Sequence, residues 1–163
     1  MQLPKLKIQL KIWKTLVKEL NHRGHGTRET GAFLLGDKQQ RIVTTFICYN
    51  DLDPGAFDSG IIIFNGNGFI PLWEYCTKYK VKVLADVHTH PEGWTGQSIS
   101  DSRNPMVAQR GHIALILPNF ATNKKQLLNG VGIHEFLGDG KWHVWVEDSG
   151  VIEFIKTKKN GTK

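Results

Sequence analysis

Along this chain, segments with the hydrophobic spacing of a strand are interspersed with segments that have the spacing of a helix. Residues 6–12 alternate between apolar and polar side chains, which is typical of a strand. From Leu10 to about Asn21 the apolar residues recur instead at helical spacing, so the pattern predicts a short strand followed by a helix. Helical spacing returns over residues 69–80 and predicts a second helix there.

Apolar runs bounded by glycine, proline and polar residues predict the remaining strands. They cover residues 31–36, 41–49, 61–64, 81–88, 113–118, 131–136, 142–146 and 151–155. The last three are expected to be antiparallel strands that close the sheet. A third, mostly helical segment is predicted over residues 100–110, with Asn104 and Pro105 as its cap and first position. Residues 22–26, 51–55 and 119–129 are expected to be loops.

This order of elements predicts one α/β or α+β domain, with a mixed sheet flanked by a few helices. A chain of 163 residues is the usual size for a single domain with a real core. The domain is expected to span residues 1–155. Residues 156–163 hold four lysines and no acidic residue, and are predicted to form a disordered basic tail.

Composition limits the cellular compartments and the classes of binding partner that are expected for this protein. Cys48 and Cys76 cannot build a disulfide framework and form no Cys-x-x-Cys pair, which favours a reduced, cytoplasmic setting. No apolar run approaches a membrane span, and the basic N-terminus lacks the continuous apolar core of a signal peptide. The net charge is +6, and residues 5–19 hold five lysines and one glutamate, interpreted as a solvated helix face with a surface for an acidic partner as the alternative. No nucleic-acid-binding signature is present, so neither nucleic acid nor membrane is an expected partner.

Candidate chemistry is concentrated in one segment, with the pattern His-x-His-Pro, six residues, Ser, two residues, Asp. Residues two apart on a strand point to the same face, so His88 and His90, at the end of the strand 81–88, can reach one metal ion. The following loop brings Ser98 and Asp101 near the start of the next helix, where Asp101 can supply a third ligand. Two imidazoles and a carboxylate suit a catalytic zinc ion with an open fourth position. Each residue alone has an ordinary explanation as surface, cap or turn, and the combined spacing favours the metal site.

Hydrolysis of an amide also needs a base that takes a proton from water and passes it to the leaving amine. Glu29, at the entry of the strand 31–36, is the best candidate. Glu92 is closer in sequence to the ligands but lies on the loop beside them. Asp86 is predicted on the same strand face as the two histidines, where it could orient a ligating imidazole by accepting a hydrogen bond from its other ring nitrogen.

Together these residues resemble the JAMM motif of the JAB/MPN-domain metalloproteases. Residues 29–36 match the family's glutamate before a glycine-rich apolar strand, residues 88–91 match His-Ser/Thr-His-Pro, and Ser98 and Asp101 match the final Ser-x-x-Asp. The resemblance covers about residues 5–155. It implies a cytidine-deaminase-like fold with a curved mixed sheet, and Zn²⁺ bound by the two histidines and the aspartate. It also implies that Glu29 is the general acid and base and that Ser98 stabilises the tetrahedral oxyanion.

The resemblance also implies a substrate and partners. Members of the family cleave peptide or isopeptide bonds after the C-terminal tail of ubiquitin or ubiquitin-like proteins, and others trim sulphur-carrier proteins of the same β-grasp shape. The short chain resembles stand-alone bacterial members encoded beside E1-like, E2-like and ubiquitin-like partners, some of which serve antiphage defence. A substrate tail is expected to bind as an extended strand at a sheet edge. Residues 58–64, 92–97 and 119–129 are candidates for lining its groove, and Trp94 either covers the tail or packs the loop.

Other functions fit the sequence less well. A non-catalytic MPN-type scaffold would bind partner proteins, but such versions usually lose ligands and none is lost here. A zinc deaminase requires a Pro-Cys-x-x-Cys segment, which this sequence lacks. DNA-repair-associated relatives generally lack the upstream glutamate, which is present as Glu29. Deconjugation and sulphur-carrier processing both stay open on the sequence alone.

Overall fold

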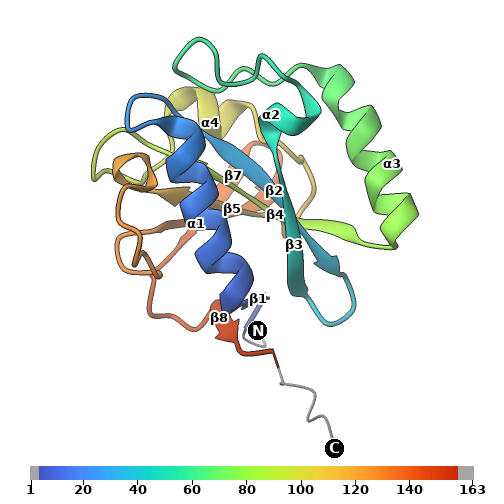
Figure 1. Ribbon diagram of the computed structural model, residues 1–163. Helices are drawn as coiled ribbons and strands as arrows, with labels where there is room; N and C mark the ends of the chain where they lie inside the picture. The colour runs from blue at the N-terminus through green and yellow to red at the C-terminus, as the bar shows by residue number, and fades with distance from the viewer. Residues whose placement is uncertain (1–3, 158–163) are drawn as a thin grey trace, which may run out of the picture.

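The computed structural model describes residues 4–157, which fold around one eight-stranded mixed sheet (Figure 1). The strands are β1 (Leu6–Gln9), β2 (Gly31–Asp37), β3 (Ile42–Cys48), β4 (Lys82–Thr89), β5 (Ile113–Leu117), β6 (Gly132–Gly138), β7 (Lys141–Trp145) and β8 (Ile152–Ile155). Their order across the sheet is β7-β6-β5-β4-β2-β3-β1-β8. Parallel pairs join β4 to β5, β1 to β3 and β1 to β8, and the other pairs are antiparallel. The predicted mixed sheet is confirmed.

Helices cover both faces of this sheet. They are α1 (Leu10–Gly24), α2 (Tyr49–Leu52), α3 (Phe69–Tyr79) and α4 (Ile99–Arg103), with 3₁₀ turns at Gly66–Gly68 and Asn119–Ala121. Side chains of β2 alternate between two cores: Ala32 and Leu34 pack on the α1 side, and Phe33 and Leu35 on the α3 side. Because both faces of β2 are buried, the strand reads in the sequence as an unbroken apolar run.

The sheet curls around α1, so that its two ends approach each other. Lys5, just before β1, lies with its Nζ 2.6 Å from Oε1 of Glu135 on β6, although the two strands stand far apart in the sheet order. The other carboxylate oxygen of Glu135 accepts a hydrogen bond of 2.8 Å from Nε1 of Trp145 on β7. The largest side chain on the enclosed helix, Trp13, is fully buried and donates its Nε1 hydrogen to the carbonyl of Gln126.

Substitution of Glu135 by glutamine is expected to make stability less dependent on pH. Burial alone would raise the pKa of the Glu135 carboxyl, but the hydrogen bonds from Lys5 and Trp145 outweigh it and lower that pKa. A lowered pKa in the folded state stabilises the protein above the unfolded pKa, and this contribution is lost as the pH falls through the folded value. Urea unfolding should show a loss of about 1–3 kcal/mol in Glu135→Gln at pH 7, shrinking below about pH 4.5. An equal loss at pH 7 and pH 3 would contradict the ionic role.

Two predicted elements differ from the structure near the site. Residues 61–64 form no strand and pair with no neighbour among the described residues; Ile61 and Ile63 are exposed, while Ile62 and Phe64 pack on the α3-side core. The predicted helix 100–110 ends at Arg103 and begins at Ile99, so Asn104 caps its C-terminus instead of starting a helix. A residue before proline is disfavoured in the helical conformation, and Pro105 therefore stops the helix.

Three further boundaries also differ from the predictions. Helix α1 continues through the predicted loop as far as Gly24, where His25 adopts a left-handed conformation as the C-cap. The predicted strand 41–49 ends at Cys48, and Tyr49 begins the short helix α2. Strand β8 pairs parallel with β1 at the opposite end of the sheet from β7, where closing antiparallel strands were expected. Alternating side chains identify a strand but not its neighbour.

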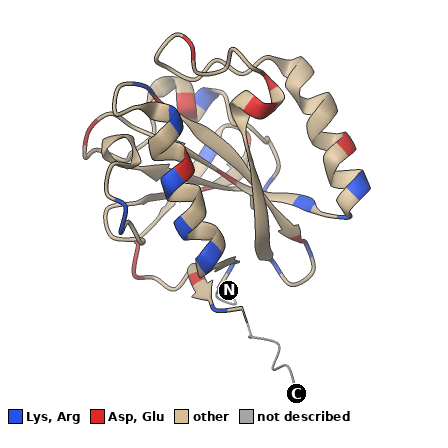
Figure 2. Ribbon diagram, viewed as in Figure 1, with Lys and Arg blue, Asp and Glu red and all other residues tan. Residues whose placement is uncertain are grey.

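Several composition-based predictions can be compared with the described residues. Cys48 and Cys76 are both buried and free, as expected. Lys11, Lys14 and Lys18 are exposed along α1, as a solvated helix face requires, and the role of this face toward a partner stays a prediction (Figure 2). No helix among the described residues is long and apolar enough to cross a membrane. Residues 158–163, most of the predicted tail, lie outside the described residues, and the proposed domain boundary at 155 stays a prediction.

Candidate metal centre

The two histidines of the motif lie at the end of β4 and point away from α1. Val87 belongs to the α1-side core, so the alternation of the strand directs His88 to the opposite face. Backbone pairing continues past the last residue of the strand: the N–H of Thr89 donates to the carbonyl of Thr30, and the N–H of His90 donates to the carbonyl of Leu117. This pairing keeps His90 in strand register, two residues after His88 and on the same face.

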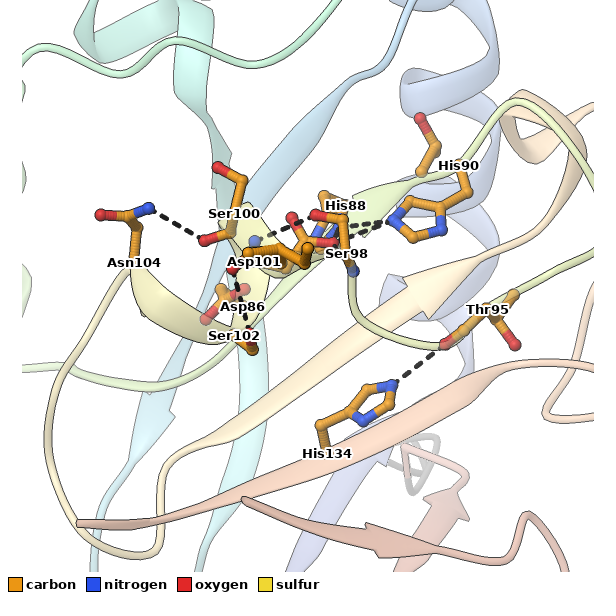
Figure 3. Close-up of polar contacts among 12 residues, drawn as sticks. Asp86, His88, His90, Thr95, Ser98, Ser100, Asp101, Ser102, Asn104 and His134 are labelled. Carbon is orange, nitrogen blue, oxygen red and sulfur yellow. Dashed lines mark hydrogen bonds and ion pairs between the residues drawn. The ribbon is translucent and has the colours of Figure 1, made fainter. Parts of the chain in front are cut away.

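The three predicted ligand atoms converge on one point (Figure 3). Nε2 of His88 and Nε2 of His90 lie 3.1 Å apart, and Oδ2 of Asp101 lies 3.4 Å from the first and 3.2 Å from the second. A tetrahedral zinc ion with bonds of about 2.0–2.1 Å has ligand atoms about 3.3–3.4 Å apart. The three atoms therefore fit three corners of such a tetrahedron and leave the fourth open. Within residues 4–157 this is the one cluster of histidine, cysteine and acidic residues found to suit a metal ion.

Asp101 is held in place by the start of helix α4. Its Oδ2 accepts a hydrogen bond of 2.9 Å from the backbone N–H of Ser98, while its own N–H donates to the Ser98 Oγ at 3.0 Å, which completes a capping box. Burial alone would raise the pKa of the Asp101 carboxyl, but hydrogen bonds with His88 and His90 outweigh it and hold that pKa well below its usual range. The aspartate is therefore a carboxylate, as a metal ligand must be.

Ser98 is both the cap of α4 and a neighbour of the centre. Its Oγ acts as the acceptor in the capping box, so its hydroxyl hydrogen stays available to donate. A serine placed one turn before a ligand in this way can stabilise the helix and still aim a donor at a reacting carbonyl. The structural role of the serine, a cap, and its predicted role in catalysis are thus compatible.

The main chain of Trp94 contributes a contact that side-chain reasoning missed. Its carbonyl oxygen lies 3.0 Å from Nδ1 of His90, and the two rings stack with centroids 5.6 Å apart. A hydrogen on Nδ1 that is donated to this carbonyl leaves the lone pair of His90 on Nε2, the atom aimed at the metal position. A backbone contact carries no signal in the sequence, although loops after strand-end ligands commonly supply one. The indole is 61% exposed, which is compatible with the predicted contact to substrate.

Glu29 is brought to the centre by its neighbours, although it lies 59 residues before His88 in the chain. The backbone N–H of Thr30 donates to Oγ1 of Thr89 at 2.9 Å, and the N–H of Glu29 donates to the carbonyl of Gly60. Glu29 is half-buried, and burial raises the pKa of its carboxyl above the usual value, although the imidazoles of His88 and His90 oppose the shift. The structure thus places a partly desolvated carboxyl close enough to His88 and His90 for their imidazoles to act on its pKa.

Gly31, two residues after Glu29, has to be a glycine for a steric reason. Gly31 pairs with His88 across the sheet, and a Cβ at this position would collide with the ring of Tyr49 and the carbonyl of Val87. Only glycine lets β2 pass this close to the end of β4, and with it the segment that carries Glu29.

Asp86 lies behind the centre and does not take the predicted role. Its Oδ2 accepts a hydrogen bond of 2.6 Å from Nε2 of His112, and Oδ1 lies 3.5 Å from the hydroxyl of Tyr49. No hydrogen bond joins it to His88 or His90 among the contacts that the described residues make. Asp86 does orient an imidazole, but the ring belongs to His112, which no motif in the sequence singles out.

The three segments predicted to line a groove all reach the centre through their backbones. Gly60 bonds to Glu29, Trp94 bonds to His90, and the N–H of Phe120 donates to the carbonyl of His90 at 2.8 Å. Exposed Ile61 and Ile63 lie on the first of these segments. The structure thus gathers these segments around the predicted ligands, while their contact with a substrate stays a prediction.

Comparisons with known proteins establish the fold and no more. No protein-family model matches the chain. The solution structure of protein DSY2949 from Desulfitobacterium hafniense is 14% identical, with 94% of each chain covered and a TM-score of 0.62. The crystal structure of AF2198, a JAB1/MPN domain protein from Archaeoglobus fulgidus, is 17% identical over 92% of this chain and 97% of its own, with a TM-score of 0.47. At this identity the likeness to DSY2949 shows a shared fold alone, and membership of the JAB/MPN family stays a prediction from the motif.

Proposed function

We propose that this protein is a zinc-dependent peptidase or isopeptidase of the JAMM type, which cleaves after the C-terminal tail of a ubiquitin-like protein. The observation that carries the proposal is the convergence of Nε2 of His88, Nε2 of His90 and Oδ2 of Asp101 at tetrahedral spacing. The partly buried Glu29 beside these atoms supplies the remaining chemical role. The likeness in residue pattern to JAB/MPN metalloproteases supplies the class of substrate.

The residues of the chain divide the reaction among them. A zinc ion at the centre would polarise the scissile carbonyl and lower the pKa of water to near 7. The Glu29 carboxylate takes the proton from the attacking water and passes it to the leaving amine. The Ser98 hydroxyl donates to the oxygen of the carbonyl as negative charge develops on it, which is worth about 2.7–4 kcal/mol for one such donor. The Trp94 carbonyl keeps His90 in the required tautomer throughout.

The surroundings of the centre support an extended, flexible substrate. Ile61, Ile63 and Trp94 are 57%, 59% and 61% exposed on segments that reach the ligands or Glu29. An extended tail can place its backbone between such side chains and present one peptide bond to the metal position. A β-grasp modifier is proposed as the partner that supplies this tail, with E1-like and E2-like proteins acting upstream in the same pathway, which in bacteria can serve antiphage defence.

Cleavage of defined fusions tests this function. The full chain, loaded with zinc, is incubated with ubiquitin-like and sulphur-carrier proteins, each extended by a reporter peptide or joined to a lysine side chain. Mass spectrometry should find the carrier released at the end of its tail, chelation should stop the release, and added zinc should restore it. Cleavage of sulphur-carrier fusions alone would favour the processing alternative. Stoichiometric zinc and stable capture of a β-grasp protein without any cleavage would favour a scaffold.

A further inference from the structure

The loop between the second histidine and Ser98 is fastened to the sheet by a residue that the proposed chemistry does not use. His134, on β6, is 2% exposed, and its Nε2 lies 3.0 Å from the carbonyl oxygen of Thr95 (Figure 3). The preceding carbonyl, that of Trp94, faces Nδ1 of His90. Two successive carbonyls of one loop therefore contact two imidazoles, one from a predicted metal ligand and one from strand β6.

The same loop segment, residues 94–96, has two more contacts, one with β6 and one with the residues just before it. The Oγ1 of Thr95 donates to the carbonyl of Gly130 at 2.9 Å. At Gly132 a Cβ would collide with the Thr95 carbonyl oxygen, so the backbone of the loop lies directly on the strand. A side chain at residue 132 would push the loop away from the strand. The close approach of the loop, and not the geometry of β6, therefore requires glycine at this position.

His134 leaves one buried polar atom without a partner, which would be an unfavourable choice for a residue that only fills space in the core. Burial lowers the pKa of this ring, so the neutral form with one donor and one acceptor is favoured. Donation from Nε2 to Thr95 leaves Nδ1 as an acceptor, and this atom is the one buried side-chain nitrogen or oxygen among the described residues that has no hydrogen-bond partner. An unsatisfied buried acceptor destabilises the folded protein. An apolar side chain of similar size would avoid this cost but would release the loop.

We propose that His134 is a positioning residue, which holds the loop 94–96 so that the Trp94 carbonyl meets Nδ1 of His90 and Ser98 stays beside the centre. The inference rests on the proposed function, because it takes His88, His90 and Asp101 as the metal site. His134 acts through the loop, and among the described residues no hydrogen bond joins it to His88, His90 or Asp101. The consequence is that metal affinity depends on a residue of β6, which lies two strands away from the ligand strand β4.

Four variants of the full chain test this role. His134→Ala removes the donor, His134→Gln keeps an amide donor at similar reach, and Gly132→Ala displaces the loop directly, because its methyl group would collide with the Thr95 carbonyl and with Nε2 of His134. Val144→Ala, on the neighbouring strand β7 at an exposed position, is the matched control. Zinc affinity is measured by competition with a chromophoric chelator, and hydrogen exchange of a peptide covering residues 92–98 is measured with and without zinc.

His134→Ala and Gly132→Ala are expected to bind zinc about 10- to 100-fold more weakly, the usual effect of removing support from a ligating histidine. Exchange of residues 92–98 should be faster in both, with exchange of the β2 and β4 peptides unchanged. His134→Gln should recover most of the affinity, and Val144→Ala should match the wild type. If His134→Ala does not fold, His134→Leu, which fills the same space without a donor, takes its place, and Gly132→Ala then reports on the loop alone.

Wild-type zinc affinity and loop exchange in the folded variants would overturn the positioning role. This result can be told apart from a failure of the proposed function. In a chain that binds zinc but cleaves nothing, zinc affinity and hydrogen exchange of the loop can still be measured. A chain that binds no zinc at all would refute the metal site, while exchange of the metal-free loop would still show whether His134 holds it.

Discussion

Replacement of Glu29 by glutamine is expected to abolish cleavage while zinc stays bound. Glutamine keeps the size of the side chain but cannot accept the proton from water or return it to the leaving amine. General acid and base catalysis contributes about 100- to 10,000-fold, so kcat should fall by this factor. Zinc content should be unchanged, because Glu29 lies outside the cluster formed by His88, His90 and Asp101. Steady-state cleavage of a ubiquitin-like fusion and metal analysis of the same sample measure both quantities.

Glu92 provides the control for this experiment. It lies on the loop after His90, is exposed, and contacts the fold through its backbone carbonyl, which accepts a hydrogen bond from Asn119. Glu92→Gln should therefore cleave at the wild-type rate. Full activity in Glu29→Gln together with loss of activity in Glu92→Gln would move the base to Glu92. Loss of zinc in Glu29→Gln would instead make Glu29 part of the metal site.

Asp101→Asn is expected to lose zinc while helix α4 keeps its cap. The amide oxygen can still accept the hydrogen bond from the Ser98 N–H, but the negative charge that neutralises the ion is removed. Loss of a direct ligand should weaken zinc binding by more than the roughly 10- to 100-fold caused by loss of an outer partner. Competition with a chelator measures the affinity, and the melting temperature of the metal-free protein reports on the helix cap.

Two other changes separate the ligand from the cap. Ser98→Ala removes the capping oxygen and the proposed oxyanion donor but leaves the three ligands, so zinc should remain bound while kcat falls by about 100- to 1,000-fold. Asp139→Asn changes an exposed aspartate in the turn between β6 and β7, outside the segments predicted to line the groove, and should change neither quantity. Wild-type zinc affinity in Asp101→Asn would remove Asp101 from the metal site.

The candidate centre was largely predictable because its residues are close in sequence or sit on a recognisable strand. His88 and His90 are two residues apart on β4, and Ser98 and Asp101 form a capping box at fixed spacing. Glu29 was predictable only through the resemblance to a known motif, since 59 residues separate it from His88. The hydrogen bonds between Thr30 and Thr89 that bring it close involve residues that look ordinary in the sequence.

The two errors in the predicted strands have a common cause, and the error in the predicted helix has another. The apolar run 61–64 lacks a neighbouring strand, and the strand 151–155 pairs at the opposite end of the sheet from the one expected. Apolar periodicity reports which residues are buried, but hydrogen-bonded pairing depends on what the rest of the chain places alongside. The helix predicted over residues 100–110 ends at Arg103 because a local rule, the effect of Pro105 on the preceding residue, outweighs the pattern.

The order of apolar and polar residues is enough to predict most of the core strands and helices, the mixed character of the fold, and the set of residues able to bind a metal. Which of these residues meet, and which contacts hold them there, depends on how the elements pack together. The role of Asp86 shows the difference: its strand face was predictable, but its partner proved to be His112 instead of a ligand. Likewise, the carbonyls of Trp94 and Thr95 orient His90 and contact His134 through backbone atoms that every residue possesses. The sequence specifies which side chains are available, whereas the positions of backbone donors and acceptors are set only when the chain folds.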